Sequence, residues 1–469
     1  MRPVALSQIA RWCNGSLVGD DATVDALVTD TRSLGPGGGD ALFVAIEGAN
    51  FDGNDHVATA AALGVRAALV SRQADVALPQ VVVADTVQAL AAFAGALQRA
   101  RGAKVVAITG SNGKTTVKQL AHAIVSLDAA TSVNPGNRNN EIGLPLAVIE
   151  ADDDAACAIY EMGAGKPGDI AYLTAIARPD VALVNNVAPA HLERMRSLLA
   201  IADTKAAVYD ALPADGVAVI NADDAFAPYF ASRAHGHRLI RFGLEASADV
   251  GARDLQLSAE ASAFVLCTPQ GECEVRLPLP GRHNVGNALA AASIALALGV
   301  GLDTIARGLA SVQPVLGRLV RHRLRGGAVL VDDSYNANPG SLNAAIDTLA
   351  AAGGTSWLVL GDMRELGDDA IAMHAEAGRR AASAGIARLY ALGPLSAAAA
   401  EAFGDAARHF ASHAALAAAL AADLEAARAD PATHHPSPVT LLVKGSRGSA
   451  MDRIVDALLS ARGGNEDAA

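Results

Sequence analysis

The sequence predicts an α/β protein of three domains, in which doubly wound parallel sheets form most of the core. The first observation is length, because 469 residues exceed what one hydrophobic core usually serves and domains average about 150 residues. The second is a recurring pattern of short apolar runs, each closed by small, polar or charged residues and often followed by a helix-like segment. Continuous apolar runs are typical of parallel strands covered on both faces.

Six apolar runs mark the expected strands, and ligands of such sheets gather beyond the carboxyl ends of the strands. The runs are residues 104–109, 180–185, 216–221, 328–332, 357–361 and 439–444. The Ala-rich stretch 395–429 favours helix. The polar residues that close each run are therefore the first candidates for a functional site.

Two breaks in the sequence pattern suggest the domain boundaries. A smaller α/β pattern ends in residues 80–85, and Gln313-Pro314 separates an Ala-rich helix from the last third of the chain. The predicted domains are residues 1–84, 85–313 and 314–469.

Composition excludes several classes of function. The net charge is −12 without a dense run of Lys or Arg, which disfavours a nucleic-acid partner. No signal-peptide pattern or apolar stretch of spanning length is present, so we expect a cytoplasmic protein without stable membrane insertion. The cysteines lack CxxC spacing, which indicates neither a zinc site nor a disulfide framework.

The strongest motif is TGSNGKTT at residues 109–116, which we call the phosphate loop. It follows an apolar run and precedes a helix-like segment, as in loops whose amides cradle phosphates. Lys114 is suited to the β and γ phosphates, and Thr115 to a magnesium ion. The strict Walker pattern asks for Gly where Ile108 stands. The residues predicted to bind the phosphates are Gly110, Ser111, Asn112, Gly113, Lys114, Thr115 and Thr116.

Other polar residues are ambiguous when taken alone. Glu161 and His191 follow apolar runs, yet a lone carboxylate or histidine is more often structural. Lys205, on a helix-like stretch, would by default be solvated. Asn287 begins a small-residue helix and could read a base edge or cap that helix. Residues 332–339 (DDSYNANP) hold more polar groups than a purely structural loop explains.

Together, and in this order, the motifs resemble those of the Mur ligases of peptidoglycan synthesis, and among them the branch that adds D-alanyl-D-alanine. The likeness extends over nearly the whole chain. Besides the phosphate loop, it rests on residues 136–145 (GNRNNEIGLP), 161–163 (EMG), 189–193 (PAHLE), 281–284 (GRHN), 332–339, 360–367 (LGDMRELG) and 443–447 (VKGSR).

The resemblance implies a small N-terminal UDP-binding domain, a central P-loop ATPase domain and a C-terminal Rossmann-like domain. ATP would be held by the phosphate loop, by Asn287 at adenine, and by Arg318 and Asp333 from the third domain. Magnesium would be held by Thr115, Glu161, His191 and a carbamylated Lys205. The catalytic residues would be Lys114, His191 and Lys205.

The same resemblance implies the residues that contact the other substrates. Thr31 and Arg32 in residues 29–32, together with residues 51–55, would recognise UDP, although Asn54 stands where the family often has His. Ala207 likewise stands where the family usually has Glu. The remaining predicted substrate residues are Asn139, Asn140, Asn336, Asn338, Lys444 and Ser446.

The implied reaction joins UDP-MurNAc-tripeptide to D-alanyl-D-alanine through an acyl phosphate made from ATP, in a protein expected to be monomeric. Three alternatives stay open: the ligase that adds the third residue, a folylpolyglutamate synthase, and a non-catalytic ATP-binding paralogue. The Asp-Asn-Pro-Arg signature of a diaminopimelate-adding ligase is absent, and residues 335–339 (YNANP) occupy the comparable strand end.

Overall fold

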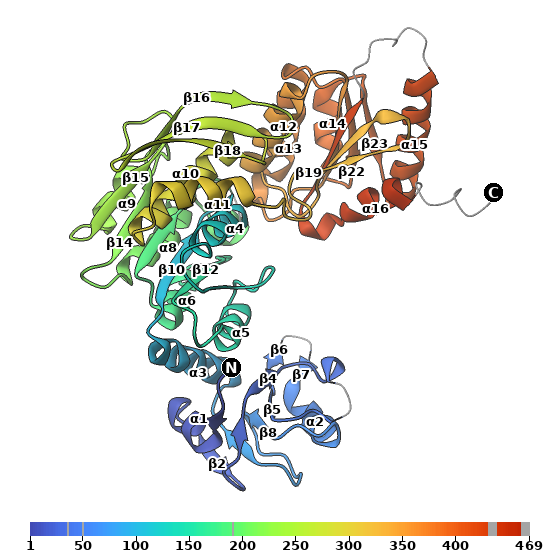
Figure 1. The fold of residues 1–469 in the computed structure, drawn as a ribbon. Coiled ribbons are helices and arrows are strands. Elements are labelled where there is room, and N and C mark those ends of the chain that lie inside the picture. The colour runs from blue at the N-terminus through green and yellow to red at the C-terminus, as the bar shows by residue number, and fades with distance from the viewer. Residues whose placement is uncertain (35–36, 49–50, 190–191, 430–438, 461–469) are drawn as a thin grey trace, which may run out of the picture.

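A computed structural model of the protein describes residues 1–34, 37–48, 51–189, 192–429 and 439–460. Three lobes follow one another along the chain (Figure 1). The first lobe runs from β1 to β9, the central lobe from α3 to α11, and the third lobe from β19 to α16. The α/β fold with a parallel central sheet confirms the predicted fold class.

The first lobe contains a five-stranded sheet in the order β2-β9-β8-β5-β4, with only β2 antiparallel to its neighbour. Two short pairs, β1 with β3 and β6 with β7, stand beside it. The strands are β1 (Val4–Ala5), β2 (Ser16–Val18), β3 (Thr23–Val24), β4 (Ala26–Val28), β5 (Ala41–Val44), β6 (Glu47–Gly48), β7 (Phe51–Asp52), β8 (Ala67–Val70) and β9 (Gln80–Val82). The helices are α1 (Leu6–Trp12), η1 (Thr31–Ser33), η2 (Gly53–His56) and α2 (Val57–Ala62).

The central lobe contains a six-stranded, fully parallel sheet in the order β11-β12-β10-β13-β14-β15, and a three-stranded antiparallel sheet in the order β16-β17-β18. The strands are β10 (Lys104–Thr109), β11 (Thr131–Val133), β12 (Cys157–Glu161), β13 (Val181–Val184), β14 (Val217–Asn221), β15 (Arg238–Phe242), β16 (Gly251–Leu257), β17 (Ser262–Thr268) and β18 (Gly271–Leu277). The helices are α3 (Thr86–Arg101), α4 (Lys114–Val125), α5 (Gly143–Glu150), α6 (Asp169–Ala177), α7 (Leu192–Met195), α8 (Leu198–Asp210), α9 (Ala227–Arg233), α10 (Arg282–Ala297) and α11 (Leu302–Ser311).

Strand β10 is buried on both faces, as its continuous apolar run predicts. Val105 and Ala107 belong to a core shared with the first lobe, and Val106 and Ile108 to a second core with α4, α10 and α11. Alternate side chains of one strand therefore hold two layers of helices in place, and this fixes the end of β10 from which the phosphate loop emerges.

The third lobe contains a six-stranded sheet in the order β19-β20-β24-β21-β22-β23, with β19 antiparallel at its edge. Helices cover both of its faces (Figure 1). The strands are β19 (Val320–Arg323), β20 (Val329–Asp333), β21 (Ser356–Gly361), β22 (Arg388–Leu392), β23 (Ala407–Phe410) and β24 (Thr440–Lys444). The helices are η3 (Arg325–Gly327), α12 (Pro339–Ala351), η4 (Gly367–Asp369), α13 (Ala370–Ser383), α14 (Ala397–Phe403), α15 (His413–Ala429), η6 (Arg447–Ser449) and α16 (Asp452–Ser460).

The structure corrects two local expectations. The Ala-rich stretch 395–429 is not all helix, because Gly404 ends α14 and β23 follows before α15 begins. The antiparallel β16, β17 and β18 were not among the expected strands. β16 has no fully buried residue, and buried residues in β17 and β18 alternate with half-buried or exposed ones, so these strands lack the continuous burial that reveals parallel strands.

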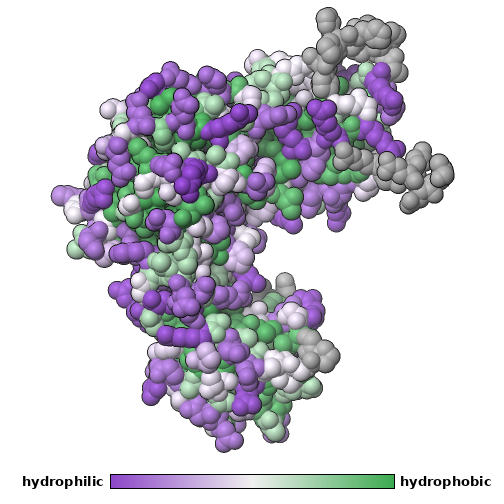
Figure 2. Space-filling model, in the orientation of Figure 1, coloured by the Kyte–Doolittle hydropathy of each residue, from purple (hydrophilic) through white to green (hydrophobic). Residues whose placement is uncertain are grey.

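Hydrophilic and hydrophobic side chains are mixed over the visible face of all three lobes (Figure 2). Within the described residues, no helix is both long and apolar enough to cross a membrane.

Candidate active site

The central and third lobes border a common cleft of about 1030 Å³. Parallel register brings the ends of the central strands together, since Ile108 lies opposite Glu161 and Thr109 opposite Val184. The phosphate loop, Glu161 and Asn185 therefore meet at one edge of the sheet. Six of the seven residues predicted to bind phosphates line this cleft, and Gly110 does not.

The phosphate loop is shaped by contacts that leave no room for side chains at its glycines. Gly113 has φ +78°, and a Cβ there would lie 2.4 Å from Asn287 Oδ1. The backbone N–H of Ser111 donates to Asn186 O (3.0 Å), and that of Asn112 to Asn186 Oδ1 (2.8 Å). Helix α4 then starts at Lys114. This is the strand, turn and helix arrangement in which a helix N-terminus binds an anion.

Lys114 and Glu161 provide the charges at this end of the cleft. Lys114 Nζ donates to Gly110 O (2.8 Å). Glu161 is 3% exposed; its carboxylate accepts from Thr115 Oγ1 (2.8 Å) and Asn139 Nδ2 (2.9 Å). Burial works to raise the pKa of Glu161, but the charges of Lys114 and Lys118, together with these hydrogen bonds, lower it below its ordinary value. Glu161 is therefore an ionised acceptor beside the loop.

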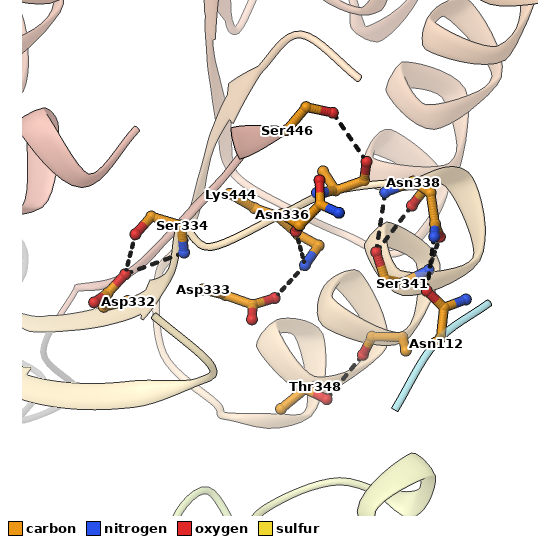
Figure 3. Close-up of polar contacts among 12 residues, drawn as sticks. Asn112, Asp332, Asp333, Ser334, Asn336, Asn338, Ser341, Thr348, Lys444 and Ser446 are labelled. Carbon is orange, nitrogen blue, oxygen red and sulfur yellow. Dashed lines mark hydrogen bonds and ion pairs between the residues drawn. The ribbon is translucent and has the colours of Figure 1, made fainter. Parts of the chain in front are cut away.

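The third lobe reaches the phosphate loop directly. Arg318 Nη2 donates to Thr115 Oγ1 (3.0 Å), and its guanidinium carbon lies 4.5 Å from the centre of the Tyr335 ring. Asn338 Nδ2 donates to Asn112 Oδ1 (2.7 Å), as Figure 3 shows. Sequence positions more than 200 residues apart thus share one site, in which a basic side chain contacts the Thr115 hydroxyl of the phosphate loop.

Lys444 and Asp333 form a buried ion pair behind these contacts (Figure 3). Lys444 Nζ lies 2.6 Å from Asp333 Oδ2 and donates to Asn336 O (3.0 Å). Burial raises the pKa of Asp333, although Lys444 acts in the opposite direction. The pair fixes the course of residues 333–338, which line the third lobe's side of the cleft.

Three family models match the chain: the Mur ligase family catalytic domain at residues 24–124, the Mur ligase middle domain at 108–295, and the Mur ligase glutamate ligase domain at 317–447. The UDP-N-acetylmuramoyl-tripeptide--D-alanyl-D-alanine ligase of Escherichia coli K12 is 41% identical, over 98% of this chain and 99% of that protein. The chain belongs to the Mur ligase family.

Two solved structures resemble this Mur ligase over nearly the whole chain. A structure of MurF from Acinetobacter baumannii matches with a TM-score of 0.92 and 33% identity, covering 98% of this chain and 99% of that one. A structure of MurF ligase from Thermotoga maritima in complex with ADP matches with a TM-score of 0.81 and 26% identity, covering 94% and 99%.

Lys205 of this Mur ligase is buried on α8, with 3% of its surface exposed. Within the described part of the chain it has no hydrogen-bond partner, and burial and the charge of Lys114 hold its pKa well below the ordinary value. An uncharged amine is the form that reacts with CO₂, so this environment suits a carbamylated lysine. His191 lies outside the described residues.

The donor set at Glu161 suits magnesium. Thr115 and Glu161 supply hard oxygen atoms, and Mg²⁺ commonly uses one or two carboxylates with phosphate oxygens and water. No group of three or more His, Cys, Asp or Glu residues that could hold a metal ion is present within the described ranges.

Several predicted ligand residues also serve the protein itself. Asn287 Oδ1 accepts from Asn185 Nδ2 (3.1 Å) and supports the back of the phosphate loop, while the residue also lines the cleft. Ser446 Oγ donates to Ala337 O (3.1 Å) and accepts from the Arg364 N–H (2.8 Å). These side chains shape the cleft from behind.

Thr31 and Arg32 lie in η1 of the first lobe and do not line this cleft. Arg32 pairs through two nitrogens with Asp30, and it lowers the pKa of Asp30 to about 2. Asn54 is buried, and its amide bonds to Asp52 and Ser71. The UDP-binding role of Thr31 and Arg32 stays a prediction.

Several residues in or beside the cleft had no role predicted from the sequence. They are Lys118, Asn134, Asn185, Asn186 and His283. Asn185 closes an expected strand and His283 lies in the GRHN motif, so the sequence marked these two positions without giving them a role. Lys118, one turn into a helix, had no such signal.

Proposed function

We propose that this Mur ligase joins D-alanyl-D-alanine to the terminal carboxylate of a UDP-MurNAc-tripeptide, using ATP. The proposal rests on the 41% identity to the E. coli ligase over nearly the whole of both chains. It is supported by a cleft that is lined by the phosphate loop of the central lobe and by Arg318, Asp333 and Lys444 of the third lobe. The domains would be residues 1–84 for UDP, 85–313 for ATP and 314–469 for the dipeptide.

The chemistry is set by the reactive groups of the substrates and the charges of the cleft. The substrate carboxylate attacks the γ-phosphorus of ATP, which forms an acyl phosphate and releases ADP. The amine of the dipeptide then attacks the carbonyl carbon, which forms the amide and releases phosphate. Lys114 would neutralise the transferring phosphoryl group, and Arg318 would do so from the third lobe. Magnesium, held by Thr115, Glu161, His191 and carbamylated Lys205, would supply further charge neutralisation.

The lobes that border the cleft also explain how the amine could compete with water. Arg318 and Asn338 touch the phosphate loop, so the third lobe covers the reacting phosphate when these contacts form. Asn139 and Asn140 would border the acceptor peptide, and Asn336, Lys444 and Ser446 the dipeptide. We also propose a monomer in the cytoplasm.

The deciding experiment incubates the protein with ATP, magnesium, UDP-MurNAc-tripeptide and D-alanyl-D-alanine. We expect phosphate and UDP-MurNAc-pentapeptide in equal amounts, both dependent on the dipeptide. Equal phosphate release without the dipeptide would overturn the assignment. Activity with glutamate and a folate, or with a third-residue amino acid and a UDP-dipeptide, would support the neighbouring branches instead.

A further inference from the structure

The chain uses lysine at only six of its 37 lysine and arginine positions. They are Lys104, Lys114, Lys118, Lys166, Lys205 and Lys444. Lys114, Lys166 and Lys444 line the cleft, and Lys118 and Lys205 are buried beside it. Arginine and lysine differ in shape and hydrogen-bonding geometry. A buried lysine should therefore have a structural or chemical role that an arginine could not fill. The proposed reaction assigns no such role to Lys118.

Lys118 is 1% exposed, and its ammonium group faces three oxygen atoms. Nζ donates to Asn134 O (2.8 Å) and Gly136 O (3.2 Å), and lies 3.5 Å from Glu161 Oε2. An ammonium group has three N–H donors, so this set matches its capacity. A planar guanidinium group would need more space and a different arrangement of acceptors. The site is built for lysine.

The three oxygen atoms belong to one network around residues 134–140, which we call the Asn-rich loop. Asn134 Nδ2 donates to Glu161 O (2.9 Å), and Asn134 Oδ1 accepts from the Glu161 N–H (2.9 Å). Asn139 O accepts from the Gly163 N–H (2.8 Å), and Asn139 Nδ2 donates to the Glu161 carboxylate (2.9 Å). Lys118 thus connects α4, the helix that follows the phosphate loop, to the Asn-rich loop and to Glu161.

We propose that Lys118 is a positioning residue, which holds the Asn-rich loop and the Glu161 carboxylate in fixed relation to the phosphate loop. Asn137, Asn139 and Asn140 of this loop line the cleft, whereas Lys118 does not. Lys118 therefore acts through the loop and not on a substrate. That the loop contacts the acceptor peptide rests on the proposed function.

The first test measures amide hydrogen exchange in Lys118→Met, which keeps the length of the side chain and removes its charge. We expect the Arg138 and Gly163 amides to exchange about tenfold faster or more, because their partners lie in the Asn-rich loop. The amides of residues 244–246, held by Asp223 elsewhere in the cleft, should not change. Lys104→Met is the matched control. Unchanged exchange in the Asn-rich loop would overturn the proposal.

The second test separates positioning from general damage. In Lys118→Met we expect the KM for UDP-MurNAc-tripeptide to rise roughly tenfold. The KM for ATP should rise less, within about threefold, because the bond from Thr115 still holds Glu161 beside the phosphate loop. Lys118→Arg should not restore the wild-type value. An equal rise in both KM values, or full recovery with arginine, would overturn the proposal.

Asn134→Ala provides an independent route if Lys118→Met does not fold. It removes the loop's side-chain bonds to Glu161 and leaves Lys118 in place, so it should reproduce the same exchange pattern. Intact protection in Asn134→Ala would count against the network. Exchange is measured without substrates. A wild-type protein that forms no amide would therefore overturn the proposed function while leaving the loop measurement decisive.

Discussion

The central and third lobes each place a buried lysine beside a carboxylate at the end of a parallel strand, but the distance between the two groups differs. In the central lobe, Lys118 Nζ stays 3.5 Å from Glu161 because two carbonyl oxygens hold it. In the third lobe, Lys444 Nζ lies only 2.6 Å from Asp333 Oδ2. Both carboxylates line the cleft, but Glu161 accepts from the uncharged Thr115 and Asn139, whereas Asp333 is bonded directly to its lysine. The first pair is suited to ligand chemistry and the second to shaping a loop.

The largest effect should come from Glu161→Gln. We expect ligation to fall roughly 10³-fold, because a neutral amide cannot balance cationic charge at the phosphates. The fold should persist, since glutamine can still accept from Thr115 or Asn139. Rates of UDP-pentapeptide formation and thermal melting measure the two effects, with exposed Glu401→Gln as the control. Activity close to wild type would remove Glu161 from the chemistry.

Lys444→Met should instead act on stability. It leaves the buried Asp333 carboxylate without its cation, at an expected cost of about 3 kcal/mol or more in the free energy of unfolding. Asp333→Asn in the same chain should recover much of that loss but not the activity. Chemical denaturation of both variants tests this. No recovery in the double variant would show that Lys444 stabilises the lobe through other contacts.

Lys205→Met provides the contrast, because this buried lysine has no carboxylate partner in the described part of the chain. We expect ligation to fall roughly 10²-fold while the free energy of unfolding changes by less than about 1 kcal/mol. Added bicarbonate should not restore the variant. Assays of rate and melting answer both points, and full activity would exclude Lys205 from the metal site.

The bond between Asn112 and Asn338 tests whether the two lobes are coupled. A double-mutant cycle with alanine at both positions should give a coupling energy of about 1 kcal/mol in ATP affinity. Binding measured by calorimetry on the four proteins provides the cycle. Strictly additive effects would mean that the bond is absent in solution.

The smallest effect concerns pH. Burial, with a contribution from the charge of Lys444, lowers the pKa of His283 to about 4. As pH falls below the ordinary histidine pKa, the unfolded chain binds the proton first, so the stability contributed by neutral His283 is lost between about pH 6.5 and 4. Wild type should lose somewhat more stability than His283→Gln, by less than about 1 kcal/mol between roughly pH 7 and 5.5. Parallel denaturation curves over that range would contradict this.

Much of the α/β architecture could be predicted from the apolar runs, because strands buried on both faces leave a continuous signal. β19 left none, since Arg321, His322 and Arg323 make up most of it. The phosphate loop was readable because its chemistry lies within eight consecutive residues. The role of Lys118 could not be predicted, because its partners lie in a loop and a strand that are close to it only in the folded protein. Contacts between distant segments have no local signature.

The connection between the central and third lobes is itself part of the cleft wall. Of residues 312–319, which join α11 to β19, six line it: Val312, Gln313, Val315, Gly317, Arg318 and Leu319. Gly317 and Leu319 on either side of Arg318 have φ +73° and +56°, so the backbone bends sharply there. Rotation of the backbone at this bend would move Arg318 relative to the phosphate loop and change its contact with Thr115. The link between the lobes therefore also sets the position of Arg318 in the site.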